Sequence, residues 1–209
     1  MIDSKITTEG YLVPSTENHL GVDEGALFSN YQLEAYQFAV SKCKQRRRAL
    51  DIGANYGIMS LRMIKDFEIT EAFEPLFHEY LKHNTDGNII NIHPYALGAY
   101  EQTLQMEVHT GNGGRSQIVR DKSNHHTLKQ VEVRTLDSHK FSNVDFIKMD
   151  VEGWEWHVMR GGWLTLEQCN VFMVEVNRGA KDKDNIIKYF KHRGLTYQQF
   201  QSDYVFWRN

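Results

Sequence analysis

The chain has 209 residues, of which 41% are hydrophobic and 24% charged, and its formal net charge is −3. This composition is ordinary for a globular domain, and it provides no overall electrostatic attraction to nucleic acid or to anionic membranes. No segment approaches 18 apolar residues, and the N-terminal sequence MIDSKITTEGYLV has neither the basic start nor the apolar run of a signal peptide, so we expect a cytoplasmic protein that does not enter a membrane.

The first 30 residues are polar and contain turn signals, so we expect an irregular extension or cap ahead of a folded domain at residues 31–209. Apolar residues at helical spacing predict a helix over residues 31–45. From residue 48 onward, segments with strand and helix patterns alternate. The predicted strands are 48–52, 69–73, 89–97, 144–150 and 170–176, and the predicted helices between them are 56–67, 75–84, 154–162 and 183–193.

This alternation is typical of α/β proteins with a mostly parallel, doubly wound sheet. Two features modify that pattern. Segments 103–108 and 129–136 alternate like antiparallel strands, which predicts an inserted β-hairpin near 103–134. Segments 196–200 and 204–208 have no helix between them, so we expect the sheet to end in an antiparallel C-terminal hairpin.

The sequence ALDIGANYGIMSL, residues 49–61, runs from the first predicted strand into a helix. Gly53 can adopt backbone angles that other residues resist, and Gly57 opens a helix whose free N–H groups favour an anion. Ligands of doubly wound sheets bind at the carboxyl ends of the strands, so this turn is a candidate site for a dinucleotide or for S-adenosylmethionine (SAM). Asp51 would then face an amino group of the ligand. A tight strand–helix turn without a ligand is the alternative.

A second candidate residue, Glu74, ends the next predicted strand about 20 residues after the glycine turn, where a carboxylate can bind both ribose hydroxyls. Its alternative role is to place a negative charge at a helix N-terminus, next to Pro75.

A further acidic turn follows the fourth predicted strand, in IKMDVEGWE at residues 147–155. Asp150 and Glu152 would face the same crevice as the two carboxylates named above. Carboxylates gathered in one place repel one another, and a cationic ligand such as the sulfonium of SAM would offset that cost. We therefore expect Asp150 near the methionine part of SAM or the acceptor, and Glu152 to orient or deprotonate a hydroxyl. Capping of the next helix is the alternative for either residue.

Together these residues resemble the FkbM family of SAM-dependent methyltransferases. The matching stretches lie in order over about residues 48–177 and are LDIGANYG, FEP, VEVRTLD, VDFIKMDVEGWE, VMRGG and VEVN. The resemblance implies a class I, Rossmann-like methyltransferase fold with a seven-stranded sheet. It also implies SAM as cofactor and, usually, O-methylation of a hydroxyl in a sugar or other secondary metabolite.

Carried over by position, the resemblance implies cofactor binding by Asp51, Gly53, Asn55, Gly57, Glu74, Ala96 and Asp150. Ala96 corresponds to the place where the adenine edge meets the backbone, and Asp150, Glu152 and Glu155 correspond to the signature acids. The chain departs from the family in Trp154 and in the basic, histidine-containing insertion at residues 120–129, which leaves the acceptor open.

The residues expected to contact the acceptor are Trp154, Arg115, Ser116 and Glu175. Arg115 and Ser116 belong to the loop TGNGGRSQ, for which a hairpin loop without function is the alternative. His109 and His157 are further candidates for the base.

No zinc spacing is present among the ten histidines, and we predict no metal. Mg²⁺ held by Asp150, Glu175 and Asn177 stays open as an alternative. The basic run KCKQRRR is interpreted as the cationic end of a helix rather than an RNA-binding patch. Cys43 and Cys169 lie far apart, which indicates reduced thiols.

Two other functions remain open at this stage. An NAD-dependent oxidoreductase can use a related fold, although Asn55 and the C-terminal hairpin speak against it. A non-catalytic interaction module can also retain the fold, but the acids and glycines named above argue against that reading.

Overall fold

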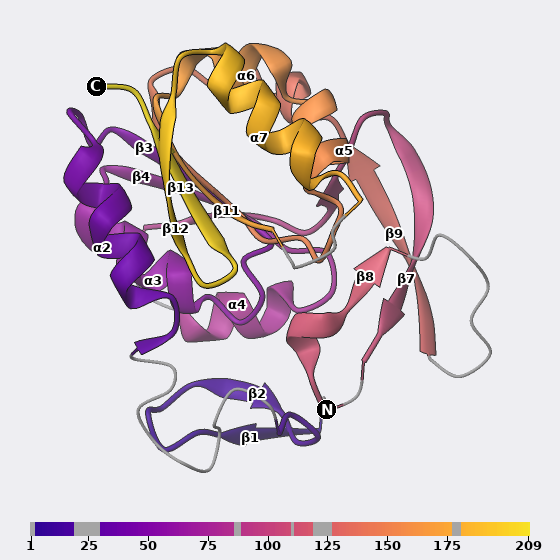
Figure 1. The fold of residues 1–209 in the computed structure, drawn as a ribbon. Coiled ribbons are helices and arrows are strands. Elements are labelled where there is room, and N and C mark those ends of the chain that lie inside the picture. Colours follow the sequence, from indigo (N-terminus) through magenta and orange to yellow (C-terminus); the bar gives the residue numbers. More distant parts are fainter. Residues whose placement is uncertain (1–2, 19–29, 86–88, 110, 119–126, 177–180) are drawn as a thin grey trace.

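The computed structural model describes residues 3–18, 30–85, 89–109, 111–118, 127–176 and 181–209 (Figure 1). Its largest element is a seven-stranded sheet with the strand order β12-β13-β11-β10-β3-β4-β5. These strands are β3 (Arg48–Ile52), β4 (Ile69–Phe73), β5 (Asn91–His93), β10 (Val144–Met149), β11 (Val171–Glu175), β12 (Thr196–Phe200) and β13 (Asp203–Trp207).

The direction of the strands confirms the predicted fold class. β3, β4, β5, β10 and β11 run parallel to one another, whereas β13 lies antiparallel between β11 and β12. A class I methyltransferase sheet has this reversed last strand. The parallel strands β3, β4 and β10 all end at the same edge of the sheet, so the turns that follow them are brought together there.

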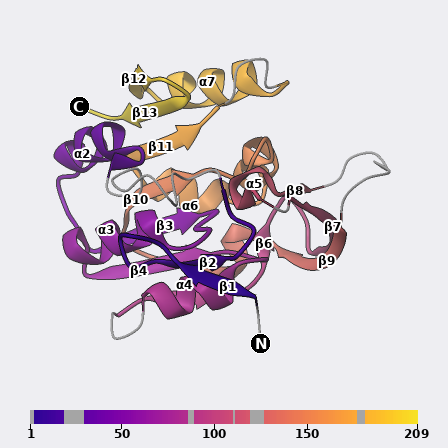
Figure 2. The same ribbon diagram turned by 90° about the horizontal axis from the view of Figure 1, so that it is seen from below.

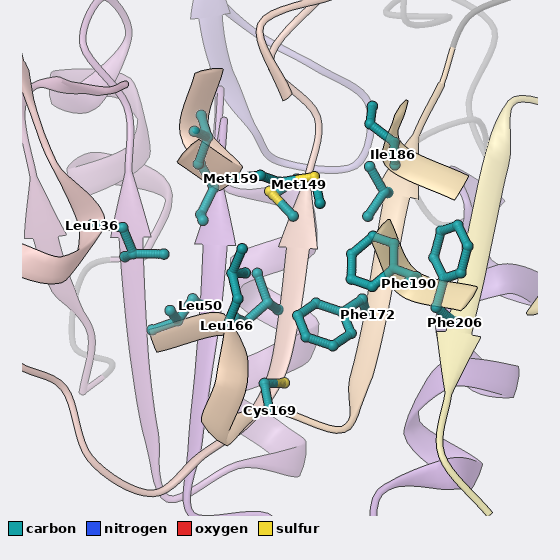
Figure 3. Packing of buried hydrophobic residues seen from close by; sticks show 14 of the residues in the cluster. Leu50, Leu136, Met149, Met159, Leu166, Cys169, Phe172, Ile186, Phe190 and Phe206 are labelled. Carbon is teal, nitrogen blue, oxygen red and sulfur yellow. The ribbon is translucent and has the colours of Figure 1, made fainter. Parts of the chain in front are cut away.

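Helices cover both faces of the sheet (Figures 1 and 2). One face is covered by α2 (Leu33–Lys42), α3 (Ile58–Asp66) and α4 (His78–Asn84), and the other by α5 (Glu155–Arg160), α6 (Trp163–Gln168) and α7 (Lys183–His192). In Figure 3, Phe172 and Phe206 of the sheet pack against Phe190 of α7. Each such fully buried side chain contributes about 1.5–3 kcal/mol to folding.

A smaller four-stranded sheet stands beside the central one (Figure 1). It contains β6 (Ala96–Leu97), β7 (Gln102–Val108), β8 (Gln117–Ile118) and β9 (Thr127–Arg134). β7 and β9 pair antiparallel, which confirms the inserted hairpin that the sequence predicted. The single strand predicted over 89–97 is wrong, because it divides into β5 and β6 at Pro94. Proline has no N–H to donate to a strand ladder.

The predicted extension contains a hairpin rather than irregular chain. β1 (Ser4–Ile6) pairs antiparallel with β2 (Leu12–Pro14), and Gly10 turns between them with a φ of 88°. The hairpin lies against α4 (Figure 1), where Asn84 bonds both the N–H and the carbonyl of Leu12. Residues 19–29 lie outside the described part of the chain.

Several predicted helix bounds also shift. The predicted helix 154–162 ends at Arg160, and α6 follows it as a separate helix. Gly161 follows α5 directly, and a Cβ there would lie 1.9 Å from the carbonyl oxygen of Gly98, so the chain at this break packs closely against Gly98. α4 begins at His78 rather than at Pro75, since Glu74 binds the intervening N–H groups. Short 3₁₀ turns cover Gly113–Arg115 (η1) and Leu136–His139 (η2).

Within the ranges that the structure covers, no helix is both long and apolar enough to cross a bilayer.

Candidate active site

A cleft opens at the carboxyl ends of β3, β4 and β10, the edge at which ligands of doubly wound sheets bind. Its walls come from the turns after these strands and from the small sheet. Of the residues predicted from the sequence, those that line the cleft are Gly53, Asn55, Glu74, Ala96, Ser116, Asp150, Glu152 and Trp154. Asp51, Gly57, Arg115 and Glu175 lie close by but are not among the lining residues.

The turn after β3 requires its glycines. Gly53 has a φ of 82°, and a Cβ at this position would lie 1.9 Å from the carbonyl oxygen of Asp150. Gly57 has a φ of 93° and begins α3, where a Cβ would lie 2.7 Å from Leu81 Cδ1. The first glycine therefore lets the turns after β3 and β10 touch, and the second lets α3 approach α4.

Asn55 and Glu74 form the next part of the cleft. The Asn55 backbone has a φ of 50°, and its N–H donates to Glu74 Oε2 at 2.9 Å. The other oxygen of Glu74 accepts the N–H groups of Leu76 at 2.7 Å and Phe77 at 3.0 Å. Burial raises the pKa of Glu74, although these backbone hydrogen bonds oppose the shift. Asn55 Oδ1 is buried and has no hydrogen-bond partner among the described residues, so it is available to a ligand.

Asp51 lies beneath the cleft instead of facing it. Its side chain is fully buried, and Ser60 Oγ donates to Asp51 Oδ2 at 2.6 Å. Lys148 Nζ lies 3.5 Å from Asp51 Oδ1. In the present structure, Asp51 therefore supports the glycine turn from below, and its predicted contact with a ligand amino group stays a prediction.

Lys148 is the important residue that the sequence analysis missed. Its Nζ lies 3.5 Å from Asp150 Oδ2 and donates to the Gly53 carbonyl at 3.1 Å. Burial alone would lower the pKa of Lys148, but Asp150 and Asp51 outweigh it and raise the pKa, so the amine stays charged. The available signal was a lysine inside the otherwise apolar strand VDFIKMD.

Three carboxylates meet at the ends of β10 and β11. One oxygen from each of Asp150, Glu152 and Glu175 lies within 4.8 Å of the others. Burial opposes ionisation of Asp150, but Lys148 and hydrogen bonds from Glu175 and Tyr31 outweigh it and lower its pKa. Burial and the Asp150 charge raise the pKa of Glu175 to about 10. We therefore expect an ionised Asp150 that accepts a hydrogen bond from a protonated Glu175.

The start of α2 supplies further donors to this cluster. Tyr31 Oη donates to Asp150 Oδ2 at 3.2 Å, and Gln32 Nε2 lies 3.4 Å from the same oxygen. Gln32 Nε2 also donates to Asp203 Oδ1 at 3.0 Å. Burial, then the charge of Asp150, raises the pKa of Asp203 to about 7. A segment predicted only as the start of a helix thus completes the acid cluster.

Glu152 has a strained backbone and an unusual acidity. Its φ is 52°, a region that non-glycine residues rarely occupy, and such strain clusters at functional sites. Burial, then the charges of Asp150 and Glu155, raises the pKa of Glu152 to about 8, while Arg115 opposes the shift. Glu152 is therefore mostly protonated at neutral pH and half ionised near pH 8.

The Glu155 side chain bonds the backbone of the same turn. Its Oε1 accepts the N–H groups of Val151 and Gly153, both at 3.1 Å. Capping of the helix had been the alternative for Asp150 and Glu152, but among the described residues no side chain makes a cap hydrogen bond to α5, and Glu155 instead holds the turn ahead of it. Burial raises the pKa of Glu155 to about 7.

Hard oxygen ligands of this kind also suit Mg²⁺. Asn177, the third member of the alternative magnesium site, lies outside the described residues. Lys148 lies 3.5 Å from Asp150 and balances part of the negative charge, and the expected absence of a metal stays a prediction.

Of the residues predicted to contact the acceptor, Ser116 and Trp154 line the cleft. The ring of Trp154 stacks on His157 with centroids 3.7 Å apart, and Ser116 Oγ accepts the His109 N–H at 3.2 Å. Arg115 belongs to η1, next to Ser116. Most of the histidine-containing insertion, residues 120–126, lies outside the described chain.

Comparison with known proteins identifies the family that this chain matches. A family model described as "Methyltransferase FkbM domain" matches residues 51–197. A crystal structure of a methyltransferase FkbM from Methylobacillus flagellatus has a TM-score of 0.55 at 14% identity, covering 90% of this chain and 62% of that one. This chain therefore spans less than two thirds of that protein's length. Such a likeness supports the fold alone.

A crystal structure of an rRNA methylase from Streptococcus thermophilus has a TM-score of 0.49 at 9% identity, covering 84% of this chain and 95% of that one. A search of curated proteins found no match.

Proposed function

This chain belongs to the methyltransferase FkbM family, and on that premise we propose that it is a SAM-dependent enzyme that methylates a hydroxyl oxygen of a sugar or secondary-metabolite-like acceptor. One observation carries the proposal. The ends of three parallel strands place Gly53, Glu74, Asp150 and Glu152 around a single cleft. A glycine turn, a ribose-binding acid and a candidate base are therefore within reach of one bound ligand pair.

The residues of the cleft fit SAM. Gly53 keeps the turn after β3 free of side-chain atoms, and Asn55 Oδ1 is a buried acceptor without a partner among the described residues. Glu74 is held by three backbone N–H groups in a fixed orientation, from which it would accept the ribose hydroxyls. The backbone at Ala96 would meet the adenine edge.

When bound, SAM supplies an activated methyl group on a positively charged sulfur. Asp150, which Lys148 and Tyr31 keep ionised, provides negative charge on that side of the cleft. The walls of the cleft hold the acceptor hydroxyl in line, and such alignment supplies much of the rate acceleration in two-substrate reactions. Trp154, Ser116, Arg115 and Glu175 are the proposed acceptor contacts.

Glu152 is the proposed general base. It lines the cleft, and a base works best when its pKa lies near the working pH. Substitution Glu152→Gln should lower kcat/KM by about 10²–10⁴-fold and remove an inflection near pH 8 from its pH profile. The assay is transfer of radiolabelled methyl from SAM to a panel of sugars and hydroxylated metabolites. A Glu152→Gln variant with an unchanged profile would exclude Glu152 as the base.

Cofactor binding is tested first, by calorimetric titration with SAM, S-adenosylhomocysteine and NAD. We expect micromolar binding of the two adenosyl ligands and its loss in Glu74→Ala. Glu79→Ala is the matched control, because Glu79 is exposed at the start of α4. Binding of NAD without SAM would support the oxidoreductase alternative, and failure to bind any of the three would support the interaction module.

We propose the cytoplasm as the compartment, a small-molecule or saccharide acceptor as the partner, and no nucleic-acid substrate. The two cysteines are free thiols, Cys169 buried and Cys43 half-buried, as expected for a reducing environment. We also keep residues 31–209 as the methyltransferase domain, with the N-terminal segment as an addition that contacts its cleft.

A further inference from the structure

A buried carboxylate from the N-terminal segment reaches the edge of the cleft. Glu17 follows β2 and is only 1% exposed. One of its oxygens, Oε2, accepts the hydroxyl proton of Tyr56 at 2.7 Å and the N–H of Gly113 at 2.7 Å. A carboxyl oxygen has two lone pairs, so Glu17 holds two donors at one point.

The two donors belong to different parts of the cleft. Tyr56 lies between Asn55, which lines the cleft, and Gly57, which begins α3. Gly113 begins the 3₁₀ turn that leads to Ser116, and both of these residues line the cleft. Glu17 therefore joins the turn after β3 to the cleft-lining segment that begins at Gly113.

The contact between these segments is tight. A Cβ at Gly113 would lie 2.0 Å from the Tyr56 hydroxyl oxygen, so only glycine allows the chain to pass over this ring. A second tie lies next to it, because the Asn18 N–H donates to the Gly111 carbonyl at 3.0 Å. The N-terminal segment thus holds the turn at two adjacent points.

Tyr56 is itself a fixed anchor. It is fully buried, and its ring meets Phe77 and Tyr80 edge-on with centroids 5.0 Å and 5.9 Å apart. The Asn84 side chain donates to the Tyr56 carbonyl at 2.8 Å and to the Leu12 carbonyl at 3.0 Å, which ties the same tyrosine to β2. Through Glu17, the turn at Gly113 is therefore bonded to Tyr56, a residue that is itself held rigidly.

We propose that Glu17 is a positioning residue, through which the N-terminal segment holds residues 111–116 in place as a wall of the cleft. The assignment of this cleft to SAM and its acceptor rests on the proposed function. Both donors meet at one oxygen of Glu17. A glutamine carbonyl oxygen also has two lone pairs, but its side chain presents N–H groups in place of the second carboxylate oxygen. Removal of Glu17 should free the wall without disturbing the sheet.

The test uses the full chain and three variants, Glu17→Ala, Glu17→Gln and Ser15→Ala. The last is the matched control, because Ser15 lies two residues before Glu17 and its hydroxyl donates to Asp3 in an exposed hydrogen bond away from the cleft residues. Hydrogen–deuterium exchange reports the order of residues 111–118, and calorimetry with S-adenosylhomocysteine reports the cleft. Both readouts work without knowledge of the acceptor.

For Glu17→Ala we expect exchange at residues 111–118 to rise by about tenfold or more and the Kd for S-adenosylhomocysteine to rise with it, while β3 and β10 keep their protection. Glu17→Gln, which keeps one acceptor of the same size, should fall between Glu17→Ala and the wild type. Ser15→Ala should match the wild type.

Two results would overturn the proposal. One is unchanged exchange and unchanged Kd in Glu17→Ala. The other is a uniform rise in exchange over β3, β10 and residues 111–118, which would indicate a loss of global stability only. If the wild type transfers no methyl group to hydroxyl acceptors while the local rise at 111–118 is observed, the O-methylation proposal fails and the role of Glu17 stands.

Discussion

Lys148 provides the positive charge on which the buried acids of the cleft depend, and replacing it with methionine tests this directly. Its Nζ lies 3.5 Å from oxygens of both Asp51 and Asp150 and donates to the Gly53 carbonyl. Lys148→Met keeps a flexible apolar side chain of similar reach and removes the charge and the donors. Three buried acceptors would then lose their common partner.

The size of the effect follows from the geometry. Two unit charges 3.5 Å apart interact with about 5 kcal/mol at an effective dielectric constant of about 20, and part of that gain offsets the cost of burying the amine. Removing one member of a buried ion pair typically costs about 3–5 kcal/mol, because a charge is left uncompensated. We therefore expect Lys148→Met to lower the free energy of unfolding by about 3–5 kcal/mol near neutral pH.

The loss should depend on pH. In the wild type the pKa of Asp150 lies below its ordinary value, so ionised Asp150 contributes stability above about pH 4 that is lost as the pH falls. Without Lys148 the pKa of Asp150 should rise above its ordinary value, and its charge then costs stability as the pH increases. The difference between wild type and variant should be smaller at about pH 5 than at about pH 8.

Urea unfolding at these two pH values measures the effect. Lys65→Met is the control, since Lys65 is exposed on α3 and its loss should change stability by less than about 0.5 kcal/mol. Asp150→Asn in the Lys148→Met background should recover part of the loss. A loss below about 1 kcal/mol, or an equal loss at both pH values, would refute the assigned role of Lys148.

Three further predictions concern the same edge of the sheet. Gly53→Ala should lower the free energy of unfolding by more than about 2 kcal/mol and abolish SAM binding, whereas Gly194→Ala, with a φ of 75° and open space around it, should cost only about 1–2 kcal/mol; equal losses would show that the approach to Asp150 does not matter. The raised pKa values of Glu175 and Asp203, about 10 and about 7, mean that stability is greatest below their ordinary values and is lost as the pH rises through the raised ones. The free energy of unfolding should therefore fall between about pH 5 and about pH 9, by at most about 1.4 kcal/mol per pH unit for each carboxyl until the pH passes its raised pKa. Glu175→Gln should flatten the slope, as measured by denaturant unfolding across this range. Methyl transfer should survive treatment with a chelator, and its loss with recovery on adding Mg²⁺ would show that the acid cluster holds a metal.

Local sequence patterns were sufficient for most of the fold. The alternating strand and helix segments predicted the parallel sheet, because a strand buried on both faces has a continuous apolar run whatever its neighbours are. The connection between residues 200 and 204 is too short for a helix, and this predicted the antiparallel pair β12 and β13. Pro94 was visible in the sequence, yet its effect on β5 and β6 depends on which strand each half can pair with, and that is decided by distant residues.

The sequence by itself determined which chemistry the chain carries: a glycine turn, a carboxylate at the end of the second strand, and the acids of IKMDVEGWE. These signals are local, since turn geometry and strand ends are encoded in neighbouring residues. Only the tertiary structure decided how the acids divide their roles. Asp51 became a buried partner of Lys148, Glu155 bonded the backbone of the turn before α5, and Glu152 faced the cleft. The reason is that burial and charge pairing depend on groups far apart in the chain, such as Glu17 and Gly113, which meet only after folding.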